Sequence, residues 1–181
     1  INDYGMQILA LGHSVLKDSQ ARYKGNYIDW VIEKMKEKNV YPVGSRKLSF
    51  GAYKAGQEAA KIIIEEMIKK TTERMGIKFD EWFSENSLHK SNQVDKTLKL
   101  LKKKGLIYEK EGAQWFKSTK FGDVRDRVVV KKDGQKTYLA GDIAYHRYKF
   151  EKKKFDKVIN IWGADHAGDV LSLQAAVEAL G

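Results

Sequence analysis

The fold class follows from one stretch late in the chain, Val158-Ile159-Asn160-Ile161-Trp162-Gly163-Ala164-Asp165-His166. Its apolar residues predict a buried β-strand from Lys157 to Trp162, and the four residues after the strand predict a turn. Helical patterns lie on both sides, from Asp142 to about Lys152 and from about Val170 to Leu180. A helix, a buried strand and a second helix in this order are typical of α/β architecture.

Helical spacing dominates residues 1–105, where apolar side chains recur every three or four positions. Gly76 and Gly105 each follow a helical stretch and are natural C-terminal stops. The predicted elements are a helix capped by Asn2 or Asp3, a helix after Gly25, a loop from Asn39 to Ser49, a long helix from Phe50 to Met75, a short strand from Lys78 to Phe83 and a basic helix from Ser91 to Lys104.

Short β-like runs replace the helical spacing from Leu106 onward. The dipeptide Asp133-Gly134 is a strong turn signal and predicts a hairpin between the last two runs. The predicted strands are Leu106 to Tyr108, Gln114 to Phe116, Arg127 to Lys131 and Lys136 to Leu139.

The chain is basic, since 34 Lys and Arg residues against 24 Asp and Glu residues give a net charge of +10. This charge suits a nucleic acid partner, whose phosphates attract lysine side chains. It equally suits lysine-rich helices that are simply hydrated. The seven lysines within residues 86–110 fit either interpretation.

Several protein classes are excluded by composition. The absence of cysteine excludes disulfide frameworks, thiolate metal sites and cysteine nucleophiles. No apolar run approaches the roughly 20 residues that a membrane-spanning helix needs. The chain starts at Ile1 without a targeting peptide, so we expect an excerpt of a cytoplasmic protein that has no membrane partner.

Asp142 stands at the start of a predicted helix, where the helix dipole and free amides should keep its carboxylate ionised. One interpretation is an ordinary N-cap. In the other, the carboxylate and the phenol of Tyr138 hold a planar guanidinium, whose donors match two carboxylate oxygens. The residues alone leave both interpretations open.

The turn from Gly163 to His166 follows the predicted strand, at the edge of an α/β sheet where nucleotides bind. Glycine and aspartate also occur in such turns for backbone reasons. His146 and His166 lack the spacing of metal ligands, so we expect no metal site. Trp115 and Phe116 are predicted as core, and the charged loop from Ser118 to Arg127 as surface.

Segments along most of the chain resemble the arginyl-tRNA synthetase family. They occur in the family's order and include its Ile-Asn-Asp-x-Gly-x-Gln and Gly-Ala-Asp-His patterns. The matching segments are Ile1 to Gln7, Phe79 to Glu85, Gly112 to Trp115, Phe121 to Asp123, Asp126 to Val128, Thr137 to His146 and Trp162 to His166.

The resemblance implies an α/β fold, as part of a Rossmann-like class I synthetase catalytic domain with a largely helical insertion. Residues 1–21 would belong to the nucleotide-binding core, residues 22–110 to the insertion and residues 111–181 to the core again. The family's His-x-Gly-His motif and mobile lysine-rich loop do not occur in the chain. We therefore expect this portion to be inactive alone.

The resemblance also implies the site residues. Tyr138 and Asp142 match positions that bind the arginine guanidinium, and His166 is assigned to the same arginine site. Gly163 and Asp165 match the turn beside the bound adenylate. No residue is assigned a catalytic role.

The implied reaction activates L-arginine with ATP and Mg²⁺ to arginyl-adenylate and transfers the arginyl group to tRNA(Arg). ATP and Mg²⁺ enter as a substrate complex, and no tightly bound cofactor or structural metal is expected. The alternative is a degenerate or truncated relative that acts as a non-catalytic RNA-binding module.

Two departures from the family pattern stand out. Ala167, Gly168 and Asp169 replace the usual His-Gly-Tyr, and Val124 and Arg125 replace Asp-Lys in the charged loop. A carboxylate close to a triphosphate repels it, so Asp169 should weaken ATP binding. We expect it to leave the arginine pocket undisturbed.

Overall fold

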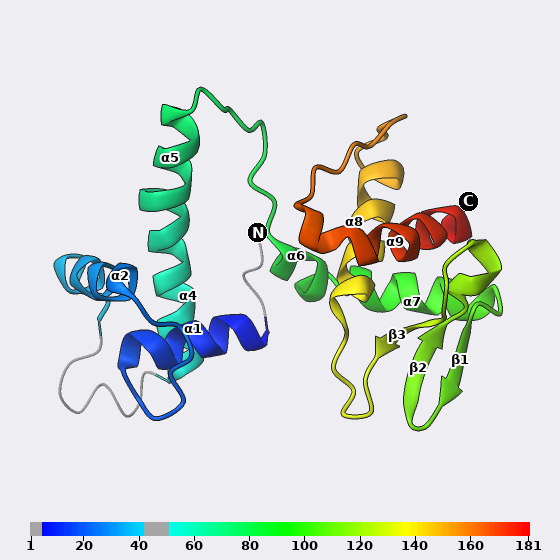
Figure 1. The fold of residues 1–181 in the computed structure, drawn as a ribbon, viewed down its shortest axis with the longest axis horizontal. Coiled ribbons are helices and arrows are strands. Elements are labelled where there is room, and N and C mark those ends of the chain that lie inside the picture. The colour runs from blue at the N-terminus through cyan, green and yellow to red at the C-terminus, as the bar shows by residue number, and fades with distance from the viewer. Residues whose placement is uncertain (1–4, 42–50) are drawn as a thin grey trace. The chain divides into compact units, whose positions relative to one another are not determined.

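The computed structural model describes residues 5–41 and 51–181. The chain forms two compact units, residues 1–86 and 87–181, and the boundary lies within helix α6 (Glu85–Lys90), shown in Figure 1. The predicted cap residues Asn2 and Asp3 and most of the predicted loop from Asn39 to Ser49 lie outside the described residues. The predicted division into core and insertion concerns the whole catalytic domain and stays a prediction.

Helices α1 (Met6–Leu16), α2 (Asn26–Glu37) and α4 (Ala52–Ile62) build the core of the first unit. They confirm the two predicted N-terminal helices and the start of the long one. Their buried side chains are Ile8, Leu11, Val15, Leu16, Ile28, Val31, Ile32, Met35, Ala55, Ala59, Ala60 and Ile62.

Helix α1 crosses α4 at two glycines. A Cβ atom on Gly12 would overlap the carbonyl oxygen of Ala52, and a Cβ atom on Gly56 would overlap that of Ile8. Only glycine lets the two backbones approach this closely, so these two residues set the distance between the helices.

The predicted long helix is confirmed, because α4 continues through a π-helical segment, η1 (Ile63–Ile68), into α5 (Lys69–Arg74). Its apolar face is buried only as far as Ile62, since no residue of η1 or α5 is buried. Figure 1 shows the reason: α1 and α2 pack against α4, whereas α5 extends beyond them. The apolar residues Met67 and Ile68, predicted to continue the packed face, are therefore partly or largely exposed.

The predicted strand from Lys78 to Phe83 is wrong, because this segment is irregular. A strand needs a neighbour for its backbone hydrogen bonds, and none of the described strands pairs with it. Its aromatic side chains contact each other instead: the rings of Phe79 and Trp82 meet edge to face, 4.9 Å apart. Helix α6, which follows, was not predicted.

After the end of α6, the second unit continues with α7 (Gln93–Lys103), the predicted basic helix. Strands β1 (Ile107–Lys110), β2 (Ala113–Phe116) and β3 (Arg127–Val130) follow and form an antiparallel sheet in the order β1-β2-β3. Three of the predicted strands are thus confirmed, with shifted ends.

The predicted hairpin after β3 is confirmed only as a turn. Its backbone closes between Lys131 and Gln135, with 2.8 Å between nitrogen and oxygen, and only Lys136 then forms a β-bridge, to Val130. The predicted strand from Lys136 to Leu139 is wrong because helix α8 (Tyr138–Glu151) starts within it. Asp142 therefore lies in the second turn of α8 and is not its N-cap, a position that Thr137 occupies.

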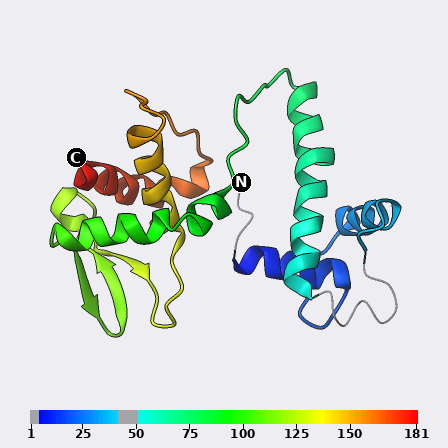
Figure 2. The same ribbon diagram turned by 180° about the vertical axis from the view of Figure 1, so that it is seen from behind.

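Helix α8 packs against α7, β3 and α9 (Ala167–Leu180), and Figures 1 and 2 show it beside α9 from both sides. A 3₁₀ turn, η3 (Ala164–His166), leads into α9. The predicted buried strand from Lys157 to Trp162 is wrong for this structure. No described strand pairs with it, and Ile159 and Ile161 are 74% and 93% exposed.

Candidate functional site

The N-terminal half of α8 presents Tyr138 and Asp142. The two residues are four positions apart and so share one face of the helix. Tyr138 is 62% exposed and Asp142 is also exposed. A ligand from solution can therefore reach both the phenol and the carboxylate.

Burial and, to a smaller extent, the negative charge of Asp169 raise the pKa of the Asp142 carboxyl to about 6, while Lys149 and His166 act in the opposite direction. The carboxyl keeps one side open to water, yet neighbouring protein atoms remove part of its hydration. The expected stabilisation by a helix terminus is wrong, because Asp142 lies one turn inside α8. The carboxylate instead belongs to a cluster of charges from α8, η3 and α9.

Asp169 is one member of this cluster. Its carboxylate lies 3.3 Å from Nδ1 of His166, and its charge acts on Asp142. Asp169 therefore adds a second negative charge to the surroundings of Asp142. The expectation that it leaves the arginine pocket undisturbed stays a prediction.

The turn that carries the predicted nucleotide residues is held locally. Nε2 of His166 lies 3.8 Å from a carboxylate oxygen of Asp165, and the rings of His166 and Trp162 lie 5.8 Å apart. Gly163 directly precedes η3, and the residues of this turn are exposed. The structure thus brings His166 into the surroundings of Asp142. Gly163 and Asp165 lie in the same turn as His166.

His146 connects α8 to the segment before this turn, a role that the sequence analysis missed. Its Nδ1 donates a hydrogen bond to the carbonyl of Asp142 over 2.8 Å, and its Nε2 lies 3.1 Å from Oδ1 of Asn160. Burial lowers the pKa of His146, which favours the neutral ring. With Nδ1 protonated, neutral Nε2 can only accept, so the Asn160 amide must then turn its NH₂ toward it. The four-residue spacing of Asp142 and His146 was the available signal.

The charged loop before β3, predicted as surface, contains a buried ion pair. The guanidinium of Arg127 donates through Nε and Nη2 to both oxygens of Asp123, over 2.7 and 2.8 Å, and the Asp123 side chain has no exposed surface. The pair lowers the pKa of Asp123 and raises that of Arg127. Nη2 of Arg127 also lies 3.4 Å from the carbonyl oxygen of Gly168 in the first turn of α9. This pair therefore positions the helix that carries Asp169.

The arrangement can bind a cation that is flat and rich in hydrogen-bond donors. The carboxylates of Asp142 and Asp169 supply negative charge, and the Tyr138 hydroxyl supplies a further oxygen. Among the described residues, no group of three or more His, Asp or Glu side chains is arranged to hold a metal ion. No described helix is both long and apolar enough to cross a bilayer.

Comparison with known proteins gives the family. The sequence profile of "tRNA synthetases class I (R), catalytic domain" matches residues 10–177. The arginine-tRNA ligase of Caldanaerobacter subterraneus subsp. tengcongensis is 40% identical over all of this chain and 34% of its own length. That of Carboxydothermus hydrogenoformans is 54% identical over 71% of this chain and 24% of its own length.

A solved structure agrees with the sequence matches. The crystal structure described as an arginyl-tRNA synthetase from Campylobacter jejuni superposes with a TM-score of 0.82 and 36% sequence identity, over 99% of this chain and 41% of that one. The fold is thus the predicted α/β class, that of part of a class I synthetase catalytic domain. This chain spans only a quarter to a third of the two curated relatives, since it covers 24% and 34% of them. The chain belongs to the class I arginyl-tRNA synthetase family, within the catalytic domain.

Proposed function

We propose that the complete protein is an arginine-tRNA ligase and that this chain supplies its arginine-recognition residues. Tyr138 and Asp142 would bind the guanidinium, with His166 beside them, and Gly163 and Asp165 would lie next to the adenylate. One observation carries the proposal: Asp142 and Tyr138 share an accessible face of α8, and His166 and Asp169 act on the charge of Asp142.

The chemistry of the guanidinium supports this assignment. It is planar, permanently charged and carries donors that match the two oxygens of one carboxylate. The raised pKa of Asp142 shows that its carboxylate has lost hydration without gaining a matching partner among its neighbours. A bound guanidinium would supply that partner and lower the pKa again.

In the proposed reaction, a carboxylate oxygen of arginine attacks the α-phosphorus of ATP, and pyrophosphate leaves. A ribose hydroxyl of tRNA(Arg) then attacks the carbonyl carbon of the adenylate, and AMP leaves. Mg²⁺ accompanies ATP as part of the substrate. The residues of this chain would bind and orient arginine, because positioning alone accounts for a large part of such rate enhancements.

Pyrophosphate exchange tests the assignment in the complete protein, with tRNA(Arg) present throughout. Asp142→Ala should lower the arginine-dependent exchange rate by roughly 100-fold or more. Bound arginine would cover the carboxylate, and the loss of one partner of a buried ion pair costs about 3 to 5 kcal/mol. The KM for ATP should change little. Asp156→Ala, which removes an exposed carboxylate of the same unit, should retain the parent rate. Exchange near the parent rate in Asp142→Ala would show that the residue is wrongly assigned.

A further inference from the structure

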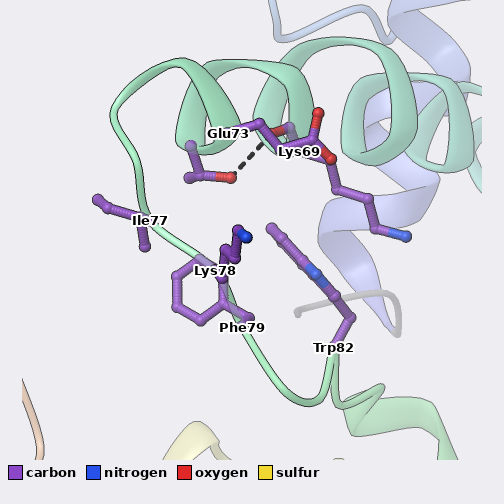
Figure 3. Close-up of a pocket in the computed structure, with 7 residues that line it drawn as sticks. Lys69, Glu73, Ile77, Lys78, Phe79 and Trp82 are labelled. Atoms are coloured by element: carbon purple, nitrogen blue, oxygen red, sulfur yellow. Dashed lines mark hydrogen bonds between the residues drawn. The ribbon is translucent and has the colours of Figure 1, made fainter.

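The first unit contains a pocket far along the sequence from Asp142. It lies between the end of α5 and the irregular segment that follows, and its cavity measures about 370 Å³. This volume is sufficient for a single nucleotide-sized ligand. Figure 3 shows the side chains that line it, among them Lys69, Glu73, Ile77, Lys78, Phe79 and Trp82.

The pocket has an aromatic wall. Phe79 and Trp82 meet at 4.9 Å with their ring planes 70° apart, and Phe79 remains 53% exposed. Nζ of Lys69 lies 5.4 Å from the centre of the Trp82 ring and 2.6 Å from a carboxylate oxygen of Glu65. These contacts hold Trp82 in place while they leave ring surface of Phe79 open for a planar ligand.

The polar groups of the pocket complement a nucleotide. Lys78 is exposed and forms no ion pair with the part of the chain that the structure describes, so its ammonium is available for a phosphate. The carboxylate of Glu73 accepts hydrogen bonds, and the exocyclic amine of a base or a ribose hydroxyl donates them. The hydroxyl of Thr72 is already engaged, because it donates to the carbonyl of Lys69 over 2.9 Å.

Two features favour a polynucleotide over a free nucleotide and over an acidic peptide. The net charge of +10 attracts a chain of phosphates. The exposed ring of Phe79, beside the partly buried Trp82, offers stacking, which an acidic peptide does not use and which every base can provide once it is unpaired. Bases within a duplex already stack on their neighbours and cannot enter the pocket.

We propose that the pocket around Phe79 and Trp82 binds an unpaired nucleotide of an RNA strand. The base stacks on the exposed ring of Phe79, against which Trp82 packs edge to face, and Lys78 binds the adjacent phosphate. This site extends the proposed function, because it places a contact with single-stranded RNA in the first unit, whereas the arginine residues lie in the second. RNA binding and arginine binding can therefore be lost separately.

Fluorescence anisotropy of a labelled ten-nucleotide oligoadenylate, titrated with the complete protein, tests the proposal. Trp82→Ala and Phe79→Ala should each weaken binding roughly 5- to 100-fold, the range observed for the loss of one stacked base. Trp82→Phe should retain much of the affinity. Lys78→Met should reduce the slope of log affinity against log salt by about 0.7, the value for one phosphate contact with a single strand.

Matched controls separate the pocket from general effects. Phe155→Ala removes an equally exposed aromatic ring, at 53%, from the second unit, and Lys24→Met removes an exposed lysine outside the pocket. Both should bind like the parent, and thermal unfolding checks that each variant is folded. Parent-like binding by folded Trp82→Ala, equal binding of a duplex of the same length, or no binding by the parent protein would each overturn the proposal. Asp142→Ala should bind the oligonucleotide like the parent. A wrong arginine assignment would therefore appear in pyrophosphate exchange and leave oligonucleotide binding unchanged.

Discussion

The guanidinium of Arg127 spans both oxygens of Asp123, and the same side chain reaches the carbonyl of Gly168. One arginine thus joins the loop before β3 to the first turn of α9. Because Asp169 lies in that turn and His166 directly precedes α9, the buried pair anchors the segment that carries both residues. The candidate site therefore adjoins an ion pair whose residues are assigned to no substrate.

Removal of one partner of this pair should destabilise the second unit. Asp123→Ala leaves the guanidinium of Arg127 largely buried without its carboxylate, which costs about 3 kcal/mol. Denaturation with urea should show a lower midpoint with an unchanged slope. Arg127→Lys, which keeps the charge but loses the two parallel bonds, should fall between Asp123→Ala and the parent. A parent-like midpoint for Asp123→Ala would mean that the pair is dispensable.

Gly12→Ala should destabilise the first unit by several kcal/mol, since its new methyl group would overlap the carbonyl oxygen of Ala52 and force α1 away from α4. The expected loss is roughly 2 to 4 kcal/mol, measured as a lower unfolding temperature. Gly168→Ala is the matched control, because nothing lies within 4 Å of its new Cβ atom. Equal unfolding temperatures for the two variants would contradict the close crossing of the helices.

Arginine affinity should depend on pH through the Asp142 carboxyl. Only the ionised form pairs with a guanidinium, so the affinity should be greatest at neutral pH and should decline as the pH falls through about 6, the pKa of Asp142. Below that value the decline should approach about tenfold per pH unit. Calorimetric titration at several pH values measures it. Asp142→Asn should bind weakly at every pH, and a steep profile in that variant would assign the dependence to another group.

His166, Lys149 and Asp169 also act on Asp142 and need their own control. His166→Asn removes the imidazole from the surroundings of Asp142. The pH profile of this variant should keep its shape, although its midpoint can shift. Loss of the profile in His166→Asn, together with its persistence in Asp142→Asn, would contradict the assignment of the profile to Asp142.

Helices were predictable because their signal is local. The period of Ala55, Ala59 and Ile62 predicts a buried face whatever the rest of the fold, and α4 buries all three. The same period failed at Ile68, where the helix extends beyond its partners. Whether an apolar face is covered depends on other segments, which the local pattern does not describe.

Strands were predictable where a partner strand lies nearby in the sequence. The β1–β2 hairpin turns at Glu111 and Gly112, both with positive φ, and its pairing lies within ten residues of sequence. The runs at Lys78–Phe83 and Lys157–Trp162 have β-like composition, but no described strand pairs with them. Composition indicates what a strand could contain, whereas pairing decides whether it forms.

The site residues also divide into those that a local pattern predicts and those that depend on contacts between distant segments. The resemblance placed Tyr138 and Asp142 on one segment, and their four-residue spacing becomes a shared helix face once α8 is known to start at Tyr138. The influence of Asp169 on Asp142 and the burial of Asp123 were not predictable, because both arise from contacts between segments that are separate in sequence.

The central claim is that the Asp142 carboxylate selects arginine by its guanidinium. Calorimetry of L-arginine and of citrulline, its uncharged analogue, tests this most directly with the complete protein and its Asp142→Asn variant. The variant should fold at least as stably as the parent at neutral pH. Because folding raises the pKa of the Asp142 carboxyl to about 6, the ionised carboxylate lowers the free energy of unfolding. This loss is complete above about pH 6 and absent below the pKa of the carboxyl in the unfolded chain.

The parent should bind arginine at least about 100-fold more tightly than citrulline, in line with the loss of a buried charged partner. Asp142→Asn should lose most of that preference. An Asp142→Asn variant that still prefers arginine by the parent's margin would contradict the account.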